Sequence, residues 1–189
     1  MFTALLDASV LVPVSLTDTI LRAAERDLFR PLWSERILDE TVRALCHVHP
    51  GTAHARFGVR VAEMKRNFPD ALVAGYEAME PSIQLPDQDD RHVVAAARVG
   101  GADLVVTSNV RHFPTDELRR WGLEVIDPDG FLQDMLDLFP REMLAVVTEQ
   151  ARDLQRPSLE LDDVLISLGR AGAKVFVSAV RERREQVKR

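Results

Sequence analysis

Two acids and one amide stand where short apolar runs or predicted helices begin and end. Asp7 follows an apolar run over residues 2–6, and Asn109 follows a second one over residues 104–106. Asp90 opens an Ala/Val-rich segment that predicts a helix ending at two glycines. In an open parallel sheet the carboxyl ends of the strands meet at one edge, where ligands bind. We therefore expect these three side chains to lie near one another and to act on a ligand.

A third acid comes from a predicted helix that begins after Ser34. Glu40 lies at the margin of the apolar stripe of this helix, so its carboxylate can turn toward the sheet edge. Spacing alone does not decide between Glu40 and Glu35. Carboxylate and amide oxygens suit Mg²⁺ or Mn²⁺, and the sequence has no cysteine cluster or suitable histidine pair for zinc. Clustered carboxylates repel one another unless a cation binds them or their pKa values rise.

These acids also have ordinary structural explanations. Aspartates before a helix commonly cap it and complement its dipole, which applies to Asp87, Asp89 and Asp90. An acid that ends a strand, such as Asp7, is often a turn residue. By helical counting Asp87 and Asp89 lie nearer the surface than Asp90, so they are secondary candidates.

The predicted elements indicate an α/β fold with a parallel sheet, followed by helices alone. Apolar runs predict short strands at residues 2–6, 81–85, 104–106 and 123–126. Periodicity and stop signals predict helices at residues 18–30, 34–49, 52–68, 70–79, 90–100 and 115–121. Four more helices are expected beyond Pro128, the first capped by Asp129. We expect one domain at residues 1–130 and a helical extension at residues 131–189.

Composition limits the possible functions of this 189-residue chain. The net charge of −6 argues against a protein that simply coats nucleic acid, although carboxylates that hold a cation would add negative charge to a nuclease. Residues 174–189 are the exception, with six basic side chains against two acidic ones. The single cysteine fits a reducing compartment, and the apolar stretches are too short for a membrane span. We therefore expect a cytoplasmic protein.

Three stretches in order carry a family resemblance: LLDASVLVP, SERILDETVRAL and LPDQDDRHVVAAARVGGADLVVTSNVRHF. Together they resemble the PIN-domain nucleases, especially the branch related to VapC-type toxins of bacterial toxin–antitoxin pairs. The resemblance covers residues 1–130 and implies a three-layer α/β/α domain with a central parallel sheet. It also implies that acids gather Mg²⁺ or Mn²⁺ to hydrolyse RNA phosphodiester bonds. The remaining residues resemble the C-terminal part of longer members and contain no chemical motif.

The resemblance assigns roles by motif. It makes Asp7, Glu40 and Asp90 the metal-holding catalytic acids. Asn109 joins the catalytic set at a position that is often Asp in PIN domains, which leaves one charge fewer.

Three more positions follow from the same motifs. Ser9 and Thr107 match small hydroxyl positions that would orient ligands or water. His112 stands where relatives often have Asp, so it departs from the pattern.

The resemblance also implies partners. They are an RNA substrate, a cognate antitoxin whose arginine could pair with the acidic cleft, and a second copy of the chain in a homodimer. Basic side chains would supply the phosphate affinity that an acidic site lacks. The candidates are Arg56, Arg60, Arg181, Arg183 and Arg184.

Two other functions remain open. A PIN-like scaffold could bind RNA or a partner protein without cutting it, and Asn109 favours this alternative. Phosphotransfer through Asp7 is disfavoured, because position 9 is Ser rather than a second Asp.

Overall fold

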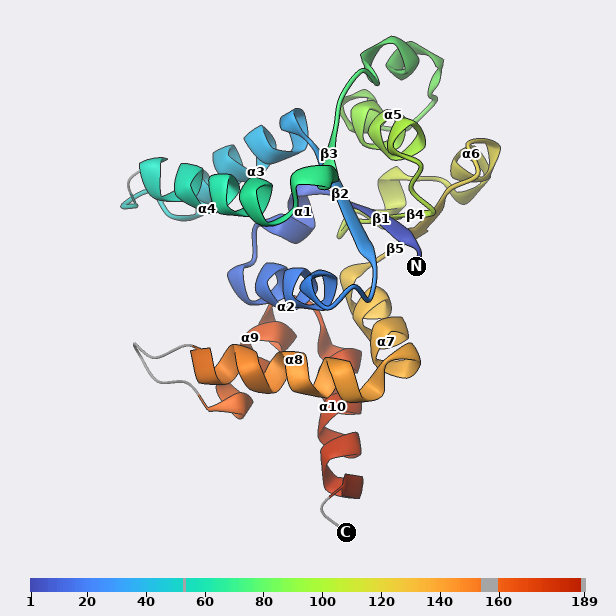
Figure 1. Ribbon diagram of the computed structural model, residues 1–189. Coiled ribbons are helices and arrows are strands. Elements are labelled where there is room, and N and C mark those ends of the chain that lie inside the picture. Colours follow the sequence, from blue (N-terminus) through green and yellow to red (C-terminus); the bar gives the residue numbers. More distant parts are fainter. Residues whose placement is uncertain (53, 154–159, 188–189) are drawn as a thin grey trace. The chain divides into compact units, whose positions relative to one another are not determined.

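A computed structural model describes residues 1–52, 54–153 and 160–187 (Figure 1). Lys188 and Arg189 of the basic C-terminal segment lie outside the described residues. The chain divides into two compact units. The sheet unit contains residues 1–12 and 29–126, and the helical unit contains residues 13–28 and 127–189.

The sheet unit is built on a five-stranded sheet in the order β3-β2-β1-β4-β5, with every neighbouring pair parallel. Its strands are β1 (Thr3–Leu6), β2 (Arg30–Ser34), β3 (Leu72–Val73), β4 (Leu104–Val106) and β5 (Glu124–Ile126). Successive residues of a strand face opposite sides of the sheet, and Ala4, Leu5 and Leu6 are all fully buried. Both faces of the central strand are therefore covered. This arrangement confirms the predicted α/β class with a parallel sheet.

Five α-helices belong to the sheet unit: α1 (Ala8–Leu11), α3 (Glu35–Val48), α4 (His54–Asn67), α5 (Arg91–Gly100) and α6 (Thr115–Arg120). Helix α5 packs on β1, β2 and β4, whereas α3 contacts β2, α1 and α4. Ser34 caps α3 through a 3.2 Å hydrogen bond from the Ile37 N–H, as predicted. Gly101 ends α5 with a φ of 70°, a left-handed conformation that suits glycine. These caps fix the ends of the two helices that carry Glu40 and Asp90.

The helical unit consists of α2 (Val14–Glu25), α7 (Pro128–Leu138), α8 (Pro140–Asp153), α9 (Leu161–Arg170) and α10 (Lys174–Val187). Its core includes fully buried Ile20, Met135, Val147, Leu165 and Phe176. The predicted C-terminal helices are thereby confirmed. Within the described residues, no helix combines the length and apolarity needed to cross a lipid bilayer.

Strand β2 differs from the prediction that a helix would run to Arg30 and stop at Pro31. Helix α2 ends at Glu25, and residues 30–34 form a strand next to the central β1. A proline lacks the N–H that a central strand needs. It is tolerated here because β3 pairs only with Trp33 and Ser34, so no β3 residue lies beside Pro31. The Arg30 N–H, one position earlier, donates to Phe2 on the other side.

Residues 69–90 also differ from the prediction of a helix and a strand. They form 3₁₀ turns η1 (Pro69–Ala71), η2 (Glu77–Ser82) and η3 (Gln88–Asp90), with β3 between the first two. A fourth turn, η4 (Val110–His112), follows β4.

One predicted helix cap was wrong. Asp127 rather than Asp129 caps α7, accepting from the Gly130 N–H at 2.9 Å. Asp129 instead accepts hydrogen bonds from two N–H groups at the start of α10.

Candidate active site

Asp7 is a buried carboxylate held by three donors at the end of β1. Its Oδ1 accepts from the Ala8 N–H at 2.7 Å, so it caps α1. Its Oδ2 accepts from the hydroxyls of Ser9, at 2.6 Å, and Thr107, at 2.7 Å. The Asp7 N–H also donates to the Val106 carbonyl at 3.0 Å. These bonds join the ends of β1 and β4 and fix the Asp7 carboxylate, which makes Ser9 and Thr107 its direct supports.

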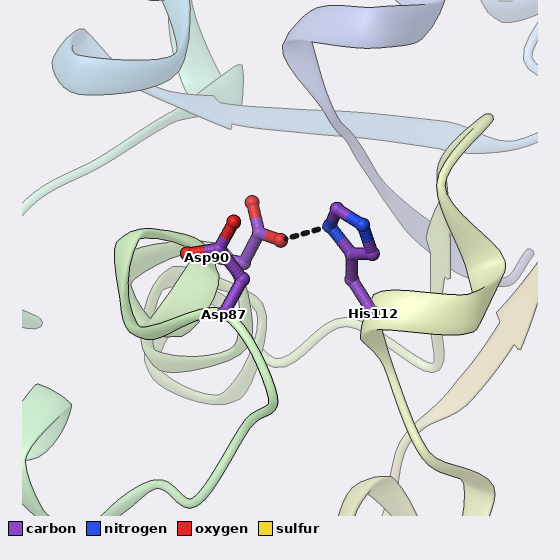
Figure 2. Close-up of side chains that lie close together, drawn as sticks. All are labelled: Asp87, Asp90 and His112. Atoms are coloured by element: carbon purple, nitrogen blue, oxygen red, sulfur yellow. Dashed lines mark hydrogen bonds and ion pairs between the residues drawn. The ribbon is translucent and has the colours of Figure 1, made fainter.

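Asp90 lies at the start of α5 and faces His112 from η4. Asp90 Oδ2 and His112 Nδ1 are 2.8 Å apart, and one ligand atom from each of Asp87, Asp90 and His112 lies within 4.8 Å of the others. Figure 2 shows the Asp90 carboxylate turned toward the imidazole of His112, with the Asp87 carboxylate beside that of Asp90. We call these three residues the Asp87–Asp90–His112 cluster.

The aspartates of this cluster differ as caps. Asp87 accepts from the Asp89 N–H at 3.0 Å and so caps η3. The Asp90 side chain makes no cap hydrogen bond. The ordinary cap explanation therefore fits Asp87, whereas Asp90 is turned toward His112.

Electrostatics link the Asp87–Asp90–His112 cluster to Asp7. Burial raises the pKa of Asp90 above its usual value, and the negative charges of Asp7 and Asp87 raise it further, against the opposing hydrogen bond with His112. A carboxyl that is harder to ionise is the expected sign of acids gathered without a cation. The cluster and Asp7 thus share one electrostatic environment.

Glu40 is engaged in a separate network. Its carboxylate lies 3.3 Å from Arg36 Nε, 3.3 Å from His92 Nε2 and 3.8 Å from Arg43. Burial raises the pKa of Glu40, but the hydrogen bonds and charges of His92 and Arg36 outweigh it and hold the pKa below its usual value. Arg36 also donates to the Asp89 carbonyl at 3.2 Å. Glu40 is therefore tied to the turn before Asp90 through Arg36, and to α5 through His92.

Asn109 joins the site through its backbone. Its N–H donates to Thr107 Oγ1 at 3.1 Å, and its carbonyl accepts from the His112 N–H at 2.8 Å. The residue is exposed. Its backbone thus connects the support of Asp7 to the turn that carries His112, while a role for its amide as a ligand stays a prediction.

The predicted RNA-contacting arginines lie in both units. On α4, Arg56 is exposed, whereas Arg60 donates to the Leu11 carbonyl at 2.9 Å and so holds the end of α1. On α10, Arg181 is exposed, Arg183 pairs with Asp137, and Arg184 lies 3.9 Å from Asp162. Two of these five arginines, Arg56 and Arg181, are thus exposed. Contact with RNA stays a prediction for all five.

Three residues near the site were not predicted from the sequence as site residues: His112, His92 and Arg36. His112 had one signal, since it departs from the residue that the family resemblance leads one to expect at its position. Arg36 is four residues before Glu40 on the same helix, a spacing at which opposite charges commonly pair. His92 had no signal, because its contact with Glu40 joins two different helices.

Two family models match the chain. One described as PIN domain matches residues 3–111, and one described as VapC50 C-terminal domain matches residues 128–182. A protein of Mycobacterium tuberculosis (strain ATCC 25618 / H37Rv) named "Putative ribonuclease VapC50" is 38% identical over 80 residues. That similarity covers 42% of this chain and 47% of the relative, so it spans about half of the mycobacterial protein. No solved structure matches the chain.

Proposed function

Because the chain belongs to the PIN domain family, we propose that it is a metal-dependent endoribonuclease that hydrolyses RNA phosphodiester bonds. We further propose that it is the toxin of a type II toxin–antitoxin pair. The observation that carries the first proposal is the convergence of Asp90, Asp87 and His112, with Asp7 acting on the charge of Asp90. Two similarities support the second proposal: the match to the VapC50 C-terminal domain and the similarity to the mycobacterial protein named as a putative ribonuclease VapC50.

The donor set fits a divalent cation. Asp87, Asp90 and His112 offer ligand atoms within 4.8 Å of one another, and burial together with the negative charges of Asp7 and Asp87 raises the pKa of Asp90. These three residues would hold the cation, with Asp7 beside them, and we propose Mg²⁺ or Mn²⁺ as its natural occupant. When bound, such a cation would supply positive charge that offsets the negative charge developing on the phosphate oxygens and would make a bound water more acidic.

The chain's own residues position the reaction. Ser9 and Thr107 fix the Asp7 carboxylate from two sides, so it does not need to reorganise when a substrate arrives. Glu40, held by Arg36 and His92, would act by orienting the segment before Asp90. Arg56 and Arg181 supply exposed cationic side chains that suit RNA phosphates.

The partners follow from the same proposal. We propose an RNA substrate, a cognate antitoxin whose cationic segment enters the acidic site, a homodimer, and action in the cytoplasm. We also propose that residue 130 divides the nuclease domain from the C-terminal extension, since it lies close to the start of the second family match at residue 128.

One observation favours a scaffold that binds RNA or a partner without cutting it. The Glu40 carboxylate is occupied by Arg36 and His92, and no contact with Asp7 or Asp90 is described for it. A site with fewer carboxylates facing the cation would cleave slowly or not at all.

Cleavage of a mixed structured RNA pool tests the proposal. The purified protein is assayed with Mg²⁺, with Mn²⁺ and with chelator, beside the variants Asp7→Ala and Asp90→Ala. Asp116→Ala is the matched control, because that side chain is 99% exposed on α6. We expect metal-dependent cleavage that both site variants lose and the control retains. Unchanged cleavage in both site variants would contradict the proposal, while RNA binding without cleavage in the wild type would support the scaffold.

A further inference from the structure

We propose that His112 makes this centre select first-row transition-metal ions over Mg²⁺, by placing one nitrogen among carboxylate oxygens. The inference rests on the proposed function, because it concerns the metal of that same site. It names the residue that sets metal preference.

The positions of the donor atoms carry the first step. His112 Nδ1 lies 2.8 Å from Asp90 Oδ2, and an oxygen of Asp87 lies within 4.8 Å of one ligand atom of each of these two residues. Two ligands on neighbouring vertices of one octahedral ion lie about 3 Å apart, given metal–ligand distances of about 2.1 Å. These two atoms share a hydrogen bond, and their spacing is that of neighbouring ligands of a single ion, which would displace the shared proton to water on binding.

The backbone around His112 holds the imidazole in this position. The His112 N–H donates to the Asn109 carbonyl at 2.8 Å, and the next residue, Phe113, is 1% exposed. The Asn109 N–H in turn donates to Thr107 Oγ1, the hydroxyl that supports Asp7. His112 is thus attached through a short hydrogen-bonded chain to the carboxylate at the end of β1. These hydrogen bonds make His112 part of the site.

The chemistry of the donors gives the selectivity. Mg²⁺ prefers hard oxygen ligands and gives up its water reluctantly, so an imidazole adds little to its binding. Mn²⁺, Co²⁺ and Ni²⁺ accept imidazole nitrogen with increasing affinity along the transition series. Where an acid stands at this position, it adds a charge that Mg²⁺ favours. A histidine has no carboxylate charge and adds a nitrogen ligand that transition metals favour.

Metal binding without RNA tests the inference apart from catalysis. Calorimetric titrations with Mg²⁺ and with Co²⁺ are run on the wild type, on His112→Asp and on the control His54→Asp. His54 is exposed at the first turn of α4, where an acid suits the helix dipole. The ratio of the Mg²⁺ to the Co²⁺ dissociation constant should fall about tenfold or more in His112→Asp, since a nitrogen ligand becomes a carboxylate. The control should leave it unchanged.

Pulsed electron paramagnetic resonance of Mn²⁺ in the wild type gives a second readout that needs no variant to fold. A ¹⁴N coupling to the bound Mn²⁺ is expected, and it should disappear in His112→Asp but persist in His54→Asp. Mn²⁺ bound without ¹⁴N coupling, together with an unchanged Mg²⁺ to Co²⁺ ratio, would overturn the role of His112 while leaving a carboxylate metal centre. Failure to bind any of these ions would overturn the metal centre of the proposed function as well.

Discussion

Replacing Thr107 with valine tests whether the hydroxyls around Asp7 stabilise the fold as well as the site. Thr107 is fully buried, and its hydroxyl donates to Asp7 Oδ2 at 2.7 Å. Thr107→Val preserves the shape of the side chain and removes the hydroxyl, which donates to Asp7 and also lies 3.3 Å from the Ser9 hydroxyl. A hydrogen bond to a charged group contributes about 1.5–3 kcal/mol, so we expect a loss of about 2 kcal/mol in the free energy of unfolding. The Asn109 N–H also loses its acceptor, but it lies in an exposed segment that water can reach.

Urea unfolding of a double-mutant cycle isolates this interaction. The cycle compares the wild type, Thr107→Val, Asp7→Ala and the double variant, and we expect a coupling of at least about 1 kcal/mol between the two positions. Thr107→Ser is the matched control, because it keeps the hydroxyl and loses only a methyl group. It should retain most of the coupling. A coupling indistinguishable from zero, or a Thr107→Val protein as stable as the wild type, would refute the proposed support of Asp7.

Four further predictions concern stability. Gly100→Ala should lower the melting temperature, since its Cβ would lie 2.7 Å from side chains of β2 and β3; overpacking of this kind costs about 1–3 kcal/mol. Gly58→Ala, with no atom within 4 Å, should instead raise it in the same melts. The backbone N–H of Gln84 helps hold the pKa of Glu117 below its usual value. Ionised Glu117 therefore stabilises the fold at pH values above its pKa in the unfolded chain, and this stabilisation is lost as the pH falls through its pKa in the folded protein. Glu117→Gln should therefore be less stable than the wild type in urea melts at neutral pH, by a margin that closes in acid. The pKa of Asp90 is raised instead, so the ionised Asp90 carboxylate destabilises the folded metal-free protein at pH 7. Asp90→Asn should therefore be more stable than the wild type at pH 7 and lose that advantage as pH falls. Equal melting temperatures at pH 7 would contradict this.

The sequence predicted the elements whose signals are local. The apolar runs before Asp7 and Asn109 are strands β1 and β4, and Ser34 caps α3 as its position indicated. Periodicity found the helices because the buried stripe of each repeats along its own sequence. The places of Asp7 and Asp90 at the ends of these elements were predictable as well, whereas their shared role in a metal site stays a prediction.

Strand β2 was not predictable by the same rules. Pro31 argues against a central strand, and its acceptance depends on β3 being only two residues long. The length of β3 depends on residues far from Pro31 in the chain, so no local pattern around Pro31 predicts it.

The partners of the site residues were hidden for a similar reason. Glu40 contacts His92, and Asp90 contacts His112, across different elements of the fold. Spacing along one helix says which side a residue faces, but it does not say which side chain of another segment meets it. The metal preference proposed for the centre depends on one such contact.

The division of the chain has a consequence for protein synthesis. Helix α2 leaves the ribosome early, yet its buried Thr19 hydroxyl donates to Gln150 of α8, 131 positions later in the chain. Arg22 of the same helix pairs with Asp153. Contacts so distant in sequence form slowly, because a long loop must close first. Until α8 has been translated, the apolar face of α2 lacks the partner that covers it, and a nascent chain stalled before that point would expose this face to chaperones.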